Sequence, residues 1–96
     1  MSLMDKYDLN ELKNETEQFL LEELEVQLNG IPDEDVCKCQ ECVLDMACLS
    51  LNNLTPRYRV SLLGTLYTQV PDKRLSQDIQ KVVSDVIQKI SQNPSH

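Results

Sequence analysis

The residues most able to do chemistry in this chain are four cysteines in one twelve-residue segment. Cys37, Cys39, Cys42 and Cys48 have the spacing C-x-C-x2-C-x5-C. Thiolates clustered at the start of a predicted helix suit a structural zinc ion, which takes four soft ligands at about 2.3 Å. Buried thiols without a metal and a redox pair are the alternatives. Cys37 and Cys39 are too close in sequence for an unstrained disulfide, so the spacing favours zinc.

The number of ligands within the cluster follows from helix geometry. In a helix that begins just before Cys42, Cys48 lies about 9 Å further along the axis and points about 120° away. We therefore expect Cys48 to be a buried apolar residue, and Cys37, Cys39 and Cys42 to bind the metal. His96 is the chain's one histidine and the predicted fourth ligand, with Cys48 as the alternative. In the other interpretation, His96 is a terminal residue that binds no metal.

The first element expected to position the cysteines is a long helix over Leu9–Asn29, with apolar residues at helical spacing. Asp8 and Glu11 have the pattern of a capping box at its start. Gly30 and Pro32 are expected to end it, because glycine tolerates a left-handed cap and proline cannot continue the hydrogen-bond ladder.

Two further helices are predicted. The segment from about Gln40 to Leu54 is apolar nearly all round, which is typical of a central, buried helix. The segment Leu75–Ile90 has one apolar stripe with a period of about 3.6 residues. Arg57–Val70 fits either a short helix or an extended segment, and we expect short helical turns. The sequence therefore predicts an all-α fold, a small bundle of three main helices.

Composition sets the expected class of protein. The chain has 16 acidic and 9 basic residues, a net charge of −7, which argues against binding DNA or RNA through the overall field. No apolar run approaches the roughly 20 residues of a membrane span, so we expect a soluble, cytoplasmic protein. The core is small and aliphatic, and a metal or a second subunit would stabilise it. We expect one domain over residues 4–93, with residues 1–3 left over from cloning.

The segment from Cys37 to Tyr58, CKCQECVLDMACLSLNNLTPRY, resembles the signature of the ComFB family of late competence proteins. That family has a cysteine cluster, a D-V-x-A-L-A-L-N helix and an L-P-P-R-Y turn. The resemblance covers about residues 10–70. The chain departs from the pattern at Met46, at Thr55 and at Cys48, which stands at a small-residue position of the motif.

The resemblance implies an all-α, zinc-carrying, cytoplasmic homodimer without known catalysis, and relatives that bind cyclic di-GMP or cyclic di-AMP. The residues Asn52, Arg57, Tyr58 and Arg59 suit such a ligand, because guanidinium groups pair with phosphates and stack on purines. A dimer would present two such sets around a twofold axis. In the other interpretation, the two arginines pair with acids of the first helix and Tyr58 packs against the turn.

Two functions follow from these patterns. The first is a non-enzymatic regulatory protein that binds a cyclic dinucleotide and signals to a protein partner in competence or motility. The alternative is a protein-interaction scaffold with structural zinc and no small-molecule ligand. An enzyme is not expected, because the one histidine is terminal and no nucleophile–base pair is visible.

Overall fold

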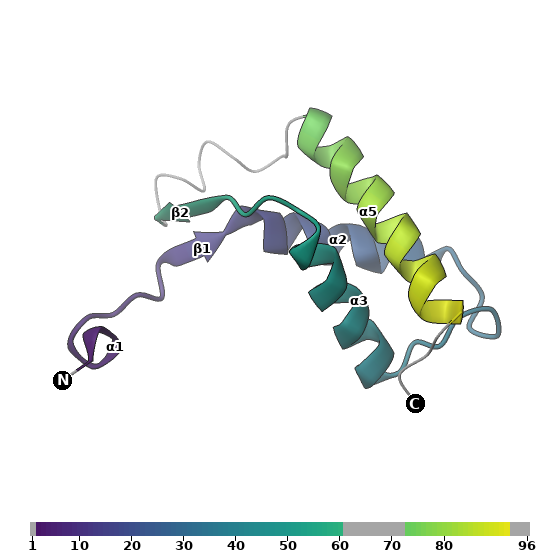
Figure 1. Cartoon of the computed structure of the whole chain (residues 1–96), viewed down its shortest axis with the longest axis horizontal. Helices are drawn as coiled ribbons and strands as arrows, with labels where there is room; N and C mark the ends of the chain where they lie inside the picture. The colour runs from purple at the N-terminus through teal and green to yellow at the C-terminus, as the bar shows by residue number, and fades with distance from the viewer. Residues whose placement is uncertain (1, 61–72, 93–96) are drawn as a thin grey trace.

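The computed structural model describes residues 2–60 and 73–92. Within these ranges the chain is mostly helical, as expected for the predicted all-α class (Figure 1). The three long helices contact one another in all three pairs and form the body of the molecule. In chain order the elements are α1 (Leu3–Lys6), β1 (Leu12–Asn14), α2 (Glu15–Asn29), α3 (Gln40–Asn52), β2 (Tyr58–Val60) and α5 (Lys73–Gln92).

The start of α2 differs from the prediction. The helix begins at Glu15, not near Leu9, and its N-cap is Asn14, whose Oδ1 accepts a hydrogen bond from the backbone N–H of Thr16 at 3.2 Å. Asp8 does not cap this helix; its Oδ1 accepts from the N–H of Asn10 at 2.9 Å. The preceding residues form β1, so pairing with a distant strand overrides their helical spacing. The predicted end at Asn29 is confirmed, but Gly30 caps the helix with right-handed and not left-handed backbone angles.

A short antiparallel ribbon accounts for that difference. β1 pairs with β2 in the register Leu12↔Val60, Lys13↔Arg59 and Asn14↔Tyr58. The expectation of helical turns after Pro56 is therefore wrong for Tyr58–Val60, and residues 61–70 lie outside the described residues. Three residues are too few to show a period of 2 in the sequence, so the pairing could not be recognised there.

The core lies between α2, α3 and α5 and is aliphatic apart from Phe19, Cys42 and Met46. α5 buries the predicted apolar stripe, and its bounds extend the expected segment slightly at both ends. α1 buries no residue, and Figure 1 shows it projecting away from the three long helices. The buried apolar residues are Phe19, Leu20, Leu24, Leu28, Val36, Cys42, Met46, Leu75, Ile79, Val83, Val86 and Ile87.

α3 is less buried than its composition suggested. It turns one face inward, with Cys42, Met46 and Ser50 at every fourth position. On the outer side Leu44 is 60% exposed and Cys48 is exposed. The expectation that Cys48 is buried is therefore wrong, because α2 and α5 cover α3 from one side. None of the described helices has the combination of length and apolar character that crossing a membrane requires.

Candidate metal centre

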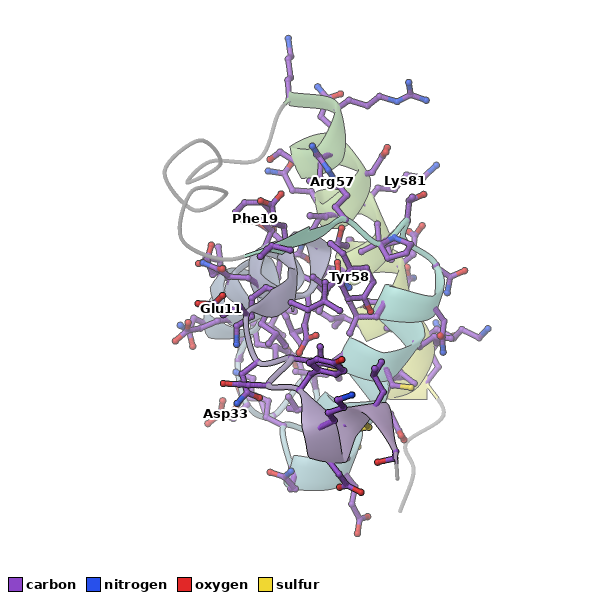
Figure 2. The ribbon with its side chains drawn as sticks, turned by 90° about the vertical axis from the view of Figure 1, so that its left-hand side faces the viewer. Glu11, Phe19, Asp33, Arg57, Tyr58 and Lys81 are labelled. Atoms are coloured by element: carbon purple, nitrogen blue, oxygen red, sulfur yellow. The ribbon has the colours of Figure 1, made fainter. Side chains whose placement is uncertain are left out.

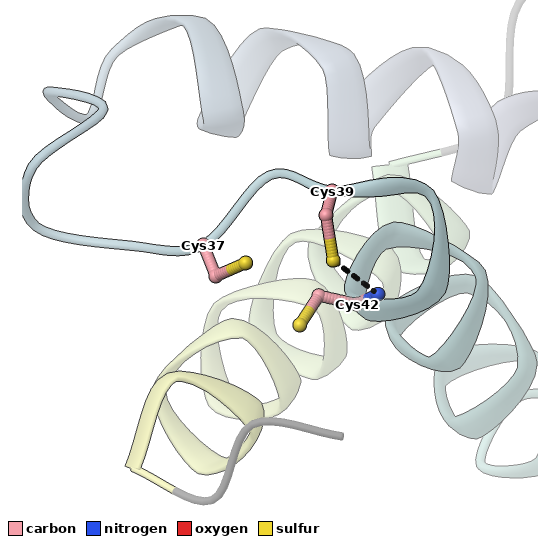
Figure 3. Close-up of side chains that lie close together, drawn as sticks. All are labelled: Cys37, Cys39 and Cys42. Atoms are coloured by element: carbon pink, nitrogen blue, oxygen red, sulfur yellow. Dashed lines mark hydrogen bonds between the residues drawn. The ribbon is translucent and has the colours of Figure 1, made fainter. Parts of the chain in front are cut away.

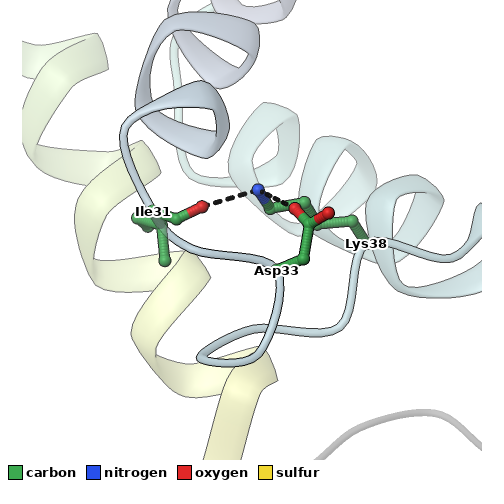
Figure 4. Close-up of polar contacts among 3 residues, drawn as sticks. All are labelled: Ile31, Asp33 and Lys38. Carbon is green, nitrogen blue, oxygen red and sulfur yellow. Dashed lines mark hydrogen bonds and ion pairs between the residues drawn. The ribbon is translucent and has the colours of Figure 1, made fainter.

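The loop between α2 and α3 is fixed at several points before it reaches the cysteines. The side chain of Val36 is buried in the core, which anchors this part of the loop to the helices. Lys38 holds it from the side, because its Nζ donates to the carbonyl oxygen of Ile31 at 2.6 Å and to Oδ1 of Asp33 at 2.7 Å (Figure 4). Lys38 stands between two cysteines in the sequence, so these contacts fix the backbone on which both are placed.

The start of α3 is capped by a cysteine. Cys39 is the N-cap residue, with extended backbone angles, and its Sγ accepts from the backbone N–H of Cys42 at 3.4 Å (Figure 3). An N-cap side chain normally satisfies one of the amide groups left unpaired at a helix start. Here a sulfur atom performs that role, which turns Cys39 toward Cys42.

The result is a cluster of three thiols. The Sγ atoms of Cys37, Cys39 and Cys42 all lie within 4.8 Å of one another. Two sulfurs on one tetrahedral zinc are about 3.8 Å apart at a Zn–S distance of about 2.3 Å, so this arrangement is close to what the metal needs. Cys42 is buried and the other two are half-buried, which leaves the cluster shielded but reachable. The donor set can therefore bind a metal ion.

Electrostatics also favour a thiolate in the cluster. The hydrogen bond from the Cys42 backbone N–H lowers the pKa of the Cys39 thiol, and a side-chain hydrogen bond with Cys37 lowers it further. Amide groups at a helix N-terminus stabilise negative charge, and the thiolate is the form that binds metal. The fold thus favours the metal-binding form of at least one ligand, because the pKa of the Cys39 thiol is lowered.

Of the two residues predicted as a fourth ligand, only Cys48 lies in the described part of the chain, and it does not join the cluster. Cys48 lies outside the group, on the outer surface of α3, with Nδ2 of Asn52 at 3.8 Å from its Sγ. His96 lies outside the described residues. Among the described residues, no other histidine, cysteine or carboxylate completes the three-sulfur group.

The residues predicted to bind a nucleotide are only partly together. The Arg57 backbone is held by α2, since its N–H donates to Oδ1 of Asn14 at 2.9 Å and its carbonyl accepts from the Glu15 N–H at 2.7 Å. Tyr58 is 62% exposed, and Figure 2 shows it on the opposite side of the chain from Arg57. Arg57 and Tyr58 therefore do not converge from one chain.

Tyr58 lines a surface groove of about 600 Å³ beside the ribbon. Asn52, at the end of α3, does not line it. The sequence did not predict this groove, because its walls combine β1 and α2 with β2, which is distant in the sequence. The residues around Tyr58 in the groove are Leu12, Lys13, Asn14, Glu17, Gln18 and Leu21.

Comparisons with known proteins identify the family and the fold of the chain. The family model described as "Late competence development protein ComFB" matches residues 13–94. The solved structure of the late competence protein ComFB from Bacillus subtilis matches with a TM-score of 0.70 and 27% sequence identity. That match covers 88% of this chain and 94% of the other. Among curated proteins, no relative matches.

Proposed function

The chain belongs to the ComFB family, and from this premise we propose that it is a non-enzymatic, cytoplasmic regulatory protein that acts as a homodimer with a structural zinc ion. The observation that carries the proposal is the cluster of Cys37, Cys39 and Cys42, whose sulfurs lie within 4.8 Å of one another. A regulatory role fits a small chain in which the clearest candidate site among the described residues is a metal-binding cluster between α2 and α3.

Cys37, Cys39 and Cys42 would hold the zinc ion, and its role is to fix the fold. Bound zinc would tie the α2–α3 loop to the first turn of α3. Metal binding to a small domain adds directly to its folding free energy. The sulfurs also lie against the core through the buried Cys42, so the ion stabilises the packing of α3.

We further propose that the ligand is a cyclic dinucleotide, bound at the groove beside Tyr58. The groove, at about 600 Å³, has the volume of a small-molecule site. The exposed Tyr58 ring can stack on a purine, and Lys13 can neutralise a phosphate. Arg57 and Arg59 flank Tyr58 in an otherwise acidic molecule. Since Arg57 points away from Tyr58, the Arg57 that completes one site would come from the other subunit.

Thermal unfolding of the zinc-loaded protein with saturating cyclic di-GMP or cyclic di-AMP tests this ligand. A ligand that binds only the folded state raises the unfolding midpoint, and we expect that rise with one of the two nucleotides. Tyr58→Ala should abolish it and Arg57→Ala should weaken it. Tyr7→Ala, which removes another exposed tyrosine, is the matched control and should change nothing. No rise with either nucleotide contradicts the nucleotide proposal.

A scaffold without a small ligand is the second candidate. The observation that favours it is an exposed apolar surface at the ribbon, where Leu12, Leu21, Tyr58 and Val60 are 46–69% exposed. Such a patch is typical of protein-binding surfaces. In the scaffold case, Tyr58→Ala and Leu21→Ser would lower the binding of a protein partner, while neither nucleotide would shift the unfolding midpoint.

A further inference from the structure

Two of the clustered cysteines, Cys39 and Cys42, have the spacing C-x2-C at the start of α3. Cys39 is the N-cap residue, and its carbonyl oxygen accepts from the backbone N–H of Val43 at 3.0 Å, so Cys39 already belongs to the first turn of the helix. Residues three apart in a helical turn have Cα atoms about 5 Å apart, which is within the range that a disulfide bridges. The backbone therefore permits a bond between these two sulfurs.

The sulfur atoms of the cluster also face one another. The Sγ atoms of its three residues lie within 4.8 Å of one another, and Figure 3 shows them turned toward a common centre. Rotation of the side chains can then join Cys39 to Cys42. Cys37 is a poorer partner for Cys39, because cysteines two positions apart form only a strained disulfide.

Cys39 and Cys42 differ in their access to solvent. Cys39 is half-buried and can be reached by a small oxidant, whereas Cys42 is fully buried. The backbone N–H of Cys42 donates to the Cys39 Sγ at 3.4 Å, and a bond of this kind stabilises negative charge on the sulfur that an oxidant meets first. A reachable sulfur beside a second, resolving cysteine is typical of cysteines that sense oxidants.

We propose that Cys39 and Cys42 are a redox pair, which a peroxide converts to a disulfide with release of the zinc ion. This inference rests on the zinc site of the proposed function and adds a second, oxidised state of the same cluster. Disulfides in a reducing compartment are usually transient, so the zinc-bound, reduced cluster is the resting state.

The reaction with hydrogen peroxide balances in two steps. The Cys39 thiolate attacks one peroxide oxygen, so that the O–O bond breaks, hydroxide leaves and Cys39 becomes a sulfenic acid. The Cys42 thiolate then attacks that sulfur and expels a second hydroxide as the S–S bond forms. Two electrons pass from the two sulfurs to the peroxide, each hydroxide takes a proton from solvent, and the zinc ion stays divalent.

Release of zinc follows from the number of ligands. A structural zinc ion takes four ligands, and the disulfide removes two of the three cluster thiolates, so that Cys37 alone remains. The loop keeps its place, because Lys38 and the buried Val36 hold it through contacts that involve no cysteine. The change is therefore reversible, since a dithiol can reduce the disulfide and the cluster can bind zinc again.

Treatment of the full, zinc-loaded chain with hydrogen peroxide tests the inference. Zinc release, followed with a chromogenic chelator, should rise in step with disulfide formation and reach about one zinc per disulfide. Peptide mapping by mass spectrometry should find Cys39 joined to Cys42, and a dithiol followed by zinc should restore the metal content. Cys48→Ser, which removes the exposed cysteine outside the cluster, is the matched control and should behave as wild type.

Two further variants separate the redox pair from the metal. Cys37→Ser should bind no zinc and still form the Cys39–Cys42 disulfide, whereas Cys39→Ser should form a disulfide roughly tenfold more slowly or not at all. The inference is overturned if peroxide releases no zinc from wild type, or if the disulfide maps to Cys37 or Cys48. In those outcomes the zinc site of the proposed function stands. A wild type that purifies without zinc contradicts the proposed function and the release of zinc, while Cys37→Ser still decides whether the pair forms.

Discussion

The side-chain Oδ1 of Asn14 accepts a hydrogen bond from the backbone N–H of Arg57 at 2.9 Å, across 43 positions of sequence. The same oxygen accepts from the N–H of Thr16 and thereby caps α2. One amide oxygen therefore joins the start of α2 to the turn that leads into β2. The turn bearing Arg57 and Tyr58 is positioned by α2 through this contact.

Asn14→Ala should consequently destabilise the protein by more than the loss of an ordinary N-cap residue does. Loss of an N-cap costs about 1 kcal/mol, and a partly buried backbone N–H left without its acceptor costs about 1–2 kcal/mol more. We expect the free energy of unfolding, measured by urea denaturation, to fall by about 2–3 kcal/mol. Asn29→Ala, at the exposed last position of α2, is the control and should have little effect. Equal effects of the two substitutions would contradict the role given to Asn14.

Removal of two buried hydroxyl groups should have different effects on the stability of the protein. The Thr16 Oγ1 donates to the carbonyl oxygen of Thr55 at 2.8 Å, whereas the fully buried Ser50 Oγ has no hydrogen-bond partner among the described residues. Thr16→Val should cost about 1–2 kcal/mol, since it leaves that carbonyl unpaired. Ser50→Ala should be neutral or stabilising by up to about 1 kcal/mol, because it removes an unsatisfied group from a helix. Urea denaturation of the two variants measures both changes in the free energy of unfolding. A strong loss of stability in Ser50→Ala would mean that the Ser50 hydroxyl has a hydrogen-bond partner.

The three long helices could be predicted from the sequence because α2 and α5 carry an apolar stripe at helical spacing and α3 is a long apolar segment. The stripe that includes Ile79 and Val83 is buried in α5 as expected. The errors occur where the structure depends on distant pairing. Leu12 lies at helical spacing with the residues of α2 but pairs with Val60, and no local pattern distinguishes the two outcomes. The distance and direction of Cys48 from Cys42 on the helix predicted a buried residue, but Cys48 is exposed, because the sequence cannot say how many sides of α3 its neighbours cover.

The cysteine cluster could be predicted from the sequence more fully than the contacts that hold its loop. Cys37 and Cys39 are two positions apart, so the chain cannot place them far from each other, and the start of α3 brings Cys42 to them. The role of Lys38 was not predictable, because its partner Ile31 offers a backbone carbonyl that no sequence pattern marks.

Lys38→Met should therefore loosen the zinc loop while keeping the apolar stem of the side chain. We expect faster zinc loss to a chelator and a lower unfolding midpoint, because the Ile31 carbonyl oxygen and Asp33 both lose their partner. Asp33→Asn is the comparison and should have a much smaller effect, since the Asp33 side chain is 92% exposed and the ion pair is screened by solvent. If Asp33→Asn releases zinc as fast as Lys38→Met, the carbonyl contact is not what fixes the loop.

The pH dependence of this ion pair follows from its sign. Hydrogen bonding to Lys38, and then its charge, lower the pKa of Asp33. A carboxyl group with a lowered pKa contributes stability above its unfolded pKa of about 3.9 and loses it as pH falls through the lower folded value. Between about pH 5 and pH 7.5, the Asp33 carboxyl group is charged in both the folded and the unfolded chain. In this range the difference in free energy of unfolding between wild type and Asp33→Asn should stay constant. Below about pH 4 the difference should change, as the unfolded carboxyl group and then the folded one take up a proton. A difference that stays constant down to about pH 2 would show that the pKa of Asp33 is the same in the folded and the unfolded chain.

Metal analysis of the purified protein and its four single cysteine variants tests the central claim most directly. We predict about one zinc per chain in wild type and in Cys48→Ser, and loss of zinc in Cys37→Ser, Cys39→Ser and Cys42→Ser. Stripping wild type with a chelator should lower its unfolding midpoint by at least about 10 °C. A metal-free wild type that unfolds cooperatively at the same temperature as the three cluster variants would contradict the account.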